Sequence, residues 1–118
     1  MNIEEYRNYC LKKKGVTESF PFDENTLVFK VMGKMFALCD VDEFESINLK
    51  AAPEEIDRRK EEYNGVLPGY HMNKKYWVTV LTNGVVSDQL LFEWIDISYE
   101  EVIKGLTKKL QAELKICK

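Results

Sequence analysis

The stretch of the sequence richest in chemically useful side chains is 69–77, which reads Gly-Tyr-His-Met-Asn-Lys-Lys-Tyr-Trp. It holds the only histidine of the chain, His71, together with Asn73, Lys74 and Lys75, and aromatic residues flank this polar group on both sides. Lysine ammonium groups neutralise phosphates, and planar side chains stack on nucleobases. This composition is compatible with nucleic-acid binding, although an exposed polar turn next to a core tryptophan would have the same composition.

Catalytic motifs are missing from the sequence. A serine or cysteine nucleophile needs a base held beside it, and nothing in the sequence marks a partner for His71. Ser87 sits where a helix N-cap belongs and Ser98 lies inside a predicted helix, so neither occupies a glycine-flanked elbow. There is also no glycine-rich phosphate loop. We therefore expect no enzymatic activity, no catalytic residue and no cofactor.

The three cysteines, Cys10, Cys39 and Cys117, are widely separated and form no C-x-x-C pair. With His71 they make four potential zinc ligands, but tetrahedral sites are usually built from closely spaced pairs of ligands. An odd number of cysteines also argues against a disulfide framework. We predict no metal site, and we interpret Cys10 and Cys39 as core residues and Cys117 as an exposed thiol.

Length and charge limit the classes of function. The chain has 118 residues, enough for one domain spanning 1–118, and 17 basic against 20 acidic residues give it a net charge of −3. Nucleic-acid binding would therefore depend on a local basic patch. No apolar run approaches the length of about 20 residues that a membrane span needs, so no membrane association is expected. The acidic, amphipathic N-terminus does not resemble a signal peptide, which predicts a cytoplasmic protein.

Periodicity and turn residues predict an α+β fold. The order is helix, three strands, helix, two strands, helix, with short links that make neighbouring strands antiparallel. We expect a two-layer sandwich in which helices cover one face of a five-stranded antiparallel sheet. The predicted helices are 3–14, 53–63, 88–104 and a short one after Thr107, and the predicted strands are 26–32, 35–39, 46–50, 70–72 and 76–81.

Two β-hairpins would position the basic residues. The first has its predicted turn at Gly33 and Lys34, with Lys30 on the preceding strand. The second would present Asn73, Lys74 and Lys75 at its tip.

Several segments together form a recognisable pattern. They are Phe-Pro-Phe-Asp at 20–23, Leu-Val-Phe-Lys-Val-Met-Gly-Lys-Met-Phe-Ala-Leu at 27–38, and Pro-Gly-Tyr-His-Met-Asn-Lys-Lys-Tyr-Trp at 68–77. Thr79-Val80 and Ser98-Tyr99 extend the pattern over nearly the whole chain. With these segments the sequence resembles the MmcQ/YjbR family of small bacterial proteins.

The resemblance implies a fold similar to secretion chaperones and bacterial frataxins. It also implies a role in DNA binding in which the two hairpins act as a double wing. Adding the flanking Tyr70 and His71, we expect the nucleic-acid-binding residues to be Lys30, Lys34, Tyr70, His71, Asn73, Lys74 and Lys75.

Three hypotheses follow for the function. The first is weak, salt-dependent DNA binding through the hairpin lysines. The second is a protein-interaction adaptor or chaperone-like module that presents an apolar sheet face, because a two-layer fold does not cover all of Val28, Met32, Met35 and Phe36. The third is a small-ligand pocket between the sheet and the long helix, lined by Trp77, Trp94 and Tyr99.

Overall fold

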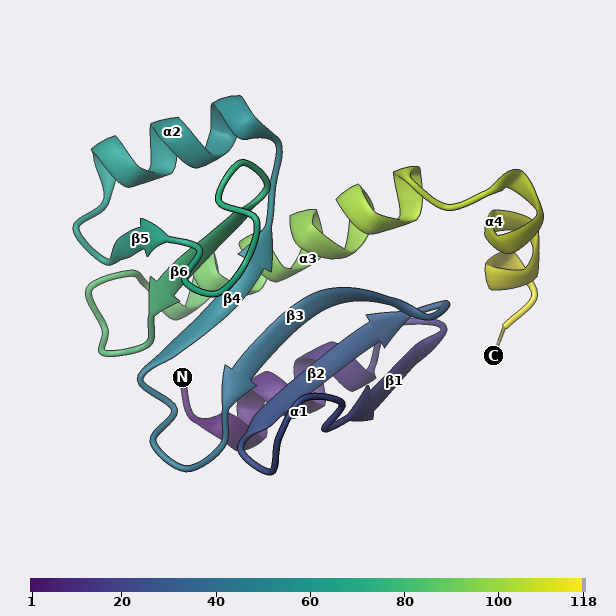
Figure 1. Ribbon diagram of the computed structural model, residues 1–118, viewed down its shortest axis with the longest axis horizontal. Coiled ribbons are helices and arrows are strands. Elements are labelled where there is room, and N and C mark those ends of the chain that lie inside the picture. Colours follow the sequence, from purple (N-terminus) through teal and green to yellow (C-terminus); the bar gives the residue numbers. More distant parts are fainter. Residues whose placement is uncertain (118) are drawn as a thin grey trace.

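The computed structural model describes residues 1–117, which form four helices and a six-stranded sheet (Figure 1). The elements are α1 (Ile3–Leu11), β1 (Val16–Ser19), β2 (Thr26–Val31), β3 (Lys34–Asp40), β4 (Ser46–Lys50), α2 (Pro53–Glu62), β5 (Val66–Pro68), β6 (Trp77–Leu81), α3 (Asp88–Lys104) and α4 (Lys108–Lys115). Within residues 1–117, no helix has the length and apolar character needed to cross a membrane.

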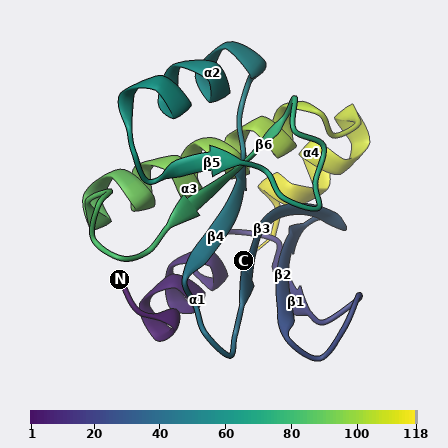
Figure 2. The ribbon, with the colours of Figure 1, turned by 60° about the vertical axis from the view of Figure 1, so that its left-hand side comes forward.

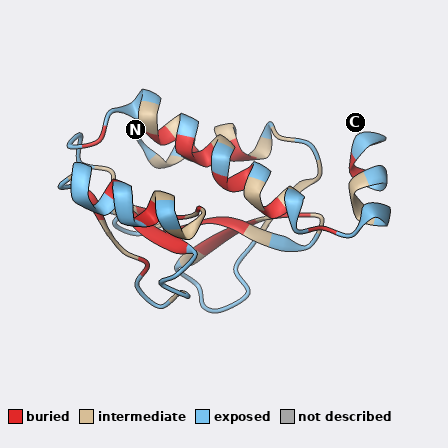
Figure 3. Cartoon of the chain, turned by 90° about the horizontal axis from the view of Figure 1, so that it is seen from above, coloured by how far each residue is buried: buried red, intermediate tan, exposed pale blue. Residues whose placement is uncertain are grey.

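The sheet is antiparallel throughout, with the strand order β1-β2-β3-β4-β6-β5. The helix α3 runs behind the middle of the sheet, α1 lies behind β2, and α2 lies next to β5 (Figures 1 and 2). The predicted α+β sandwich with helices on one face is thus confirmed, and the view from above shows its two layers (Figure 3).

The core lies between the sheet and the helices. Leu27, Phe29 and Val31 point into it from β2, as their alternation predicts, and they meet Tyr6 of α1 and Ile95 of α3. Most helix ends follow their sequence signals: Asn2 forms a capping box with Glu5, and Ser87 caps α3. The first helix nevertheless ends at Leu11 rather than at the predicted residue 14.

The prediction of five strands is wrong, because Val16–Ser19 forms a sixth. This segment pairs with β2 at the edge of the sheet, with Val16 opposite Val31 and Ser19 opposite Val28. Its four residues carry only one strongly apolar side chain, so the sequence shows little of the pattern typical of a strand. Pairing with β2 rather than intrinsic preference makes it a strand.

The turn of the first hairpin is one residue earlier than predicted. Met32 and Gly33 both have positive φ, 50° and 84°, which is the conformation of a two-residue type I′ turn. Lys34 is therefore the first residue of β3, opposite Val31.

The second predicted hairpin is wrong in its first strand. The strand is Val66–Pro68, not 70–72, and a long loop covering residues 69–76 leads to β6. His71 in this loop has φ of 63°, which a strand does not allow. Gly69 lies so close to β6 that an added Cβ would be 2.6 Å from the carbonyl oxygen of Trp77. Asn73, Lys74 and Lys75 thus lie in the loop that joins β5 to β6, and these two strands pair antiparallel.

A β-bulge changes the direction of Phe36. In the β2–β3 pair, Phe29 is opposite Ala37 while Lys30 is opposite Met35, so Phe36 is the extra residue. Phe36 consequently packs into the helix-side core, where its ring meets Tyr99 edge-on at 5.4 Å. It is not available for a partner on the other face, as the adaptor hypothesis assumed.

Candidate binding site on the open face of the sheet

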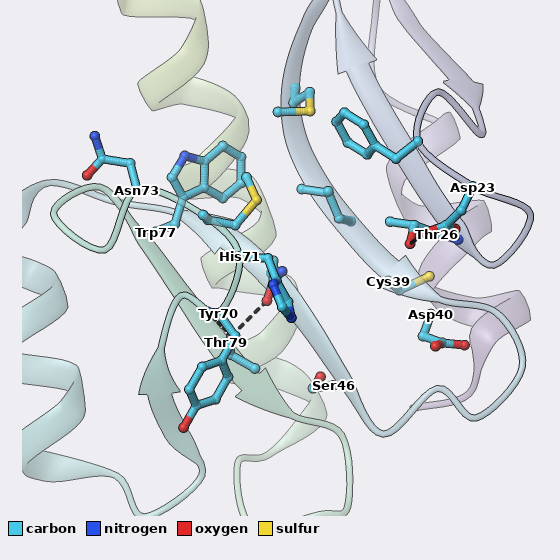
Figure 4. Close-up of a pocket in the computed structure, with 15 residues that line it drawn as sticks. Asp23, Thr26, Cys39, Asp40, Ser46, Tyr70, His71, Asn73, Trp77 and Thr79 are labelled. Atoms are coloured by element: carbon cyan, nitrogen blue, oxygen red, sulfur yellow. Dashed lines mark hydrogen bonds between the residues drawn. The ribbon is translucent and has the colours of Figure 1, made fainter.

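The face of the sheet opposite the helices contains a cavity of about 800 Å³ (Figure 4). Because partners across a sheet share a face, Leu38, Asn48 and Thr79 form one row across its floor, and Val28 continues this row on β2. The cavity is lined by Phe22, Asp23, Thr26, Met35, Leu38, Cys39, Asp40, Ser46, Asn48, Tyr70, His71, Met72, Asn73, Trp77 and Thr79. We call it the open-face cavity.

Two loops wall the open-face cavity. Phe22 and Asp23 come from the loop between β1 and β2, and Tyr70, His71 and Asn73 come from the loop at residues 69–76. Figure 4 shows His71 in the middle of the lining residues, between Trp77 and Tyr70 on one side and Cys39 and Thr26 on the other. The Phe22 and Tyr70 side chains are 63% and 49% exposed, which is unusual for large apolar groups and leaves them free to contact a ligand.

The floor of the cavity carries a short hydrogen-bond network. The Thr79 hydroxyl accepts from the backbone N–H of Tyr70 at 3.2 Å and donates to Asn48 Oδ1 at 2.8 Å. Asn48 Nδ2 has no hydrogen-bond partner within residues 1–117, so its N–H groups are available to an acceptor in the cavity. The network also ties the 69–76 loop to the sheet.

A smaller hollow of about 400 Å³ adjoins the open-face cavity and shares Met35 and Trp77 with it. Lys34 and Lys50 line this hollow next to Gly105, at the C-terminal end of α3. The negative end of a helix dipole favours cations, which helps to keep two lysines close together there.

Five lysines around this end of the sheet have no carboxylate partner. The ion pairs formed within residues 1–117 use Arg7, Lys13, Arg58, Arg59, Lys104 and the N-terminus, and none of them uses Lys30, Lys34, Lys50, Lys74 or Lys75. The Lys50 and Lys75 ammonium groups lie 6.0 Å and 5.5 Å from the centre of the same ring, that of Tyr76. We call Lys30, Lys34, Lys50, Lys74 and Lys75 the basic end of the open face. Lys34 is opposite the core residue Val31 and reaches this end from the hairpin turn, where it lines the smaller hollow.

The opposite end of the open face is acidic. Thr26 is opposite Asp40 at one end of the β2–β3 pair, whereas Lys30, on the same face as Val28, lies toward the other end. Asp23 and Asp40 both line the cavity. Hydrogen bonds from the Asn25 and Thr26 backbones and the Thr26 hydroxyl hold the pKa of the Asp23 carboxyl below its usual value, so it stays ionised. The open face is therefore electrically polarised along the strands.

The structure brings part of the predicted site together. Tyr70, His71 and Asn73 line the open-face cavity, and Lys34 lines the adjoining hollow. Lys30, Lys74 and Lys75 line neither hollow, although Lys75 contacts the Tyr76 ring beside Lys50.

Sequence reasoning missed three residues of the site: Asn48, Lys50 and Thr79. Ser46, Asn48 and Lys50 alternate with the buried Ile47 and Leu49, so the polar face of β4 was visible in the sequence. The proposed pocket lined by Trp77, Trp94 and Tyr99 is wrong, because Trp77 faces the open side while Trp94 and Tyr99 lie in the helix-side core.

The buried cysteines are poor nucleophiles and metal ligands in this fold. Burial raises the pKa of the Cys39 thiol to about 12, and it also raises the pKa of Cys10. Residues 1–117 contain no group of three or more His, Cys, Asp and Glu side chains placed to hold a metal ion.

The sequence matches a known protein family over most of its length. The YjbR family model covers residues 11–101. The chain belongs to the YjbR family. It is similar to Escherichia coli K12 YjbR, with 29% identity over 110 residues that cover 92% of this chain and 93% of that protein. It is also similar to YbdF of Escherichia coli O157:H7, with 34% identity over 113 residues that cover 95% of this chain and 93% of YbdF.

Two solved structures are similar to this chain in fold. The crystal structure of Deinococcus radiodurans protein DR2400, whose domain is named DUF419, matches with a TM-score of 0.89 and 39% identity, over 97% of this chain and 88% of that one. A Pseudomonas syringae protein structure matches with a TM-score of 0.72 and 27% identity, over 86% of this chain and 98% of that one. The family assignment made from the sequence motifs is thus confirmed.

Proposed function

We propose that this protein binds DNA weakly and without sequence specificity, through phosphate contacts at the basic end of the open face. The observation that supports the proposal most is that Lys34 and Lys50 line one hollow beside the open-face cavity while neither forms an ion pair within residues 1–117. Ammonium groups without carboxylate partners gain most from contact with phosphate and release counterions when they bind it.

The net charge of −3 limits the affinity. The acidic end of the open face and the exposed carboxylates of α2 repel a polyanion, so only the basic end contributes attraction. We expect dissociation constants in the micromolar range or weaker at physiological salt, as is typical of nonspecific binding.

Fluorescence anisotropy of labelled DNA tests the proposal, with the double variant Lys34→Ala/Lys50→Ala and the control Lys108→Ala/Lys109→Ala on α4. Both variants lose the same charge, but only the first changes the basic end. We expect the first to weaken binding and to reduce the salt slope of the logarithm of the affinity by about 1.4 to 1.8, from about 0.7 to 0.9 per phosphate contact. Equal effects of the two variants, or no binding even at about 50 mM salt, would contradict the proposal.

A protein partner is the second candidate function. The exposed Phe22 and Tyr70 side chains beside the apolar Met35, Leu38 and Met72 favour it, because such a surface fits apolar side chains of a partner. Capture of one protein from host lysate that survives nuclease treatment, and that Phe22→Ala/Tyr70→Ala abolishes, would support this function. Loss of the captured material after nuclease treatment would support DNA binding.

A further inference from the structure

The open-face cavity and the basic end are parts of one continuous surface. Met35 and Trp77 line both the open-face cavity and the hollow that holds Lys34 and Lys50. A phosphate at the two lysines is therefore next to the entrance of a cavity with aromatic and apolar walls. Phosphate and base alternate along a nucleic-acid strand, and this surface offers a matching site for each.

The cavity has the chemistry of a base-binding site. Its volume of about 800 Å³ exceeds what one nucleobase occupies, and its lining includes the planar side chains of Tyr70, His71 and Trp77, of which Tyr70 is 49% and Trp77 7% exposed. The free Nδ2 of Asn48 supplies a hydrogen-bond donor at the floor, where a carbonyl oxygen or ring nitrogen of a base would be the acceptor. Because every base has a π-face, stacking in such a site tolerates any sequence.

The accessibility of the bases and the charge of the surface both favour a single strand over a duplex at this site. Bases of a duplex are stacked in its interior and must be flipped out before they enter a cavity. A duplex laid along the open face would also place phosphates near Asp23 and Asp40 at the acidic end. A flexible single strand keeps its phosphates at the basic end while turning a base into the cavity.

We propose that the open-face cavity accepts an unpaired nucleobase of single-stranded DNA whose phosphates contact Lys34, Lys50 and Lys75. This inference rests on the proposed DNA-binding function and specifies the form of DNA that is recognised. Tyr70, His71 and Trp77 contact the base, and Asn48 donates a hydrogen bond to it.

The test compares three labelled probes of equal length with the full-length protein: an oligothymidine of roughly ten nucleotides, an abasic strand and a duplex. We expect the oligothymidine to bind about tenfold more tightly than the abasic strand, since stacking of one base on aromatic groups has about this effect. Tyr70→Ala should remove most of this difference. The control Phe20→Ala should leave it unchanged, because Phe20 has the same 49% exposure but does not line the cavity.

Tryptophan fluorescence provides a second readout. Trp77 lines the cavity, whereas Trp94 packs against Tyr63 in the helix layer. Quenching by oligothymidine but not by the abasic strand, lost in Trp77→Phe and kept in Trp94→Phe, would support a base in the cavity.

The outcomes separate the inference from the proposed function. Equal affinity for all three probes, with lysine variants still weakening binding, would overturn the base-binding inference and leave phosphate binding standing. A preference for the duplex would overturn it as well. No binding of any probe at about 50 mM salt would overturn both.

Discussion

The Ser98 hydroxyl connects three elements, so its removal tests how the fold holds the basic end in place. Ser98 lies in the middle of α3 and is fully buried. Its hydroxyl donates to the carbonyl of Phe36, the bulged residue of β3, and accepts from the backbone N–H of Lys50 at 2.8 Å. Ser98→Ala therefore leaves one donor and one acceptor without a partner at the end of the sheet.

The expected loss of stability follows from these two hydrogen bonds. A buried group left unpaired costs about 1–3 kcal/mol, so the double loss should lower the free energy of unfolding by about 2–6 kcal/mol. That is a large fraction of the roughly 5–15 kcal/mol that stabilises a typical domain. With a denaturant dependence of about 1.5 kcal/mol per molar urea, the midpoint of unfolding should fall by about 1–4 M.

Urea unfolding followed by circular dichroism measures the effect, and Ser19→Ala serves as the control because Ser19 is exposed at the sheet edge. The control should change the free energy of unfolding by no more than about 0.5 kcal/mol. In folded Ser98→Ala protein we also expect weaker DNA binding, since the backbone of Lys50 is released. A stability loss no larger than that of Ser19→Ala would refute the reasoning.

Three further predictions concern the loop, the thiols and a buried charge. Gly69→Ala should lower the midpoint of urea unfolding and weaken DNA binding, because the added Cβ would clash with the Trp77 backbone and push the cavity wall outward. Unchanged stability and affinity would contradict the close approach of the loop to β6. In thiol titration at pH 8, Cys117 should react, whereas Cys10 and Cys39 should react only after unfolding. The reason is that a thiol with a pKa of about 12, such as that of Cys39, is ionised to only about 10⁻⁴ at that pH. Reaction of Cys39 at the rate of Cys117 would contradict its burial. Arg59→Met should raise the free energy of unfolding, measured in urea, by about 1 kcal/mol, because two buried guanidinium nitrogens of Arg59 lack partners. If the substitution instead lowers the free energy of unfolding by more than about 1 kcal/mol, the contacts of Arg59 with Glu55 and Trp94 outweigh that cost.

Local signals explain why so much of the fold could be predicted. The capping box at Asn2, the Pro53 helix start and the apolar spacing of α3 act within a few residues, and each gave an element close to its observed bounds. The first hairpin was predicted for the same reason, with a shift of one residue because Met32 as well as Gly33 adopts positive φ.

The predictions that were wrong concern segments whose structure depends on contacts between residues far apart in the sequence. The segment Val16–Ser19 becomes a strand because β2 has a free edge, and Gly69 adopts its position because of β6. Arg59 looks like a surface residue in the charged sequence of α2, yet its side chain is 0% exposed and lies 4.6 Å from the ring centre of Trp94. Composition does not reveal such packing.

In the binding site, too, the residues that are neighbours in sequence could be predicted and those brought together by the fold could not. The motif at 69–77 identified Tyr70, His71 and Asn73 because they are adjacent in sequence. Lys50, Asn48 and Thr79 join them only because β4 pairs with β6, a neighbour relation between strands separated by the helix α2. Convergence of the lysines at one end of the sheet is therefore a property of the topology.

The most direct test of the central claim is a titration of ¹⁵N-labelled protein with oligothymidine, followed by backbone and indole chemical shifts. We expect the largest changes at Lys34, Lys50, Tyr70 and His71 and at the Trp77 indole, with little change at Lys108 and Lys109 on α4. Changes spread evenly over all exposed lysines, or concentrated on α4, would contradict the assignment of binding to the open face.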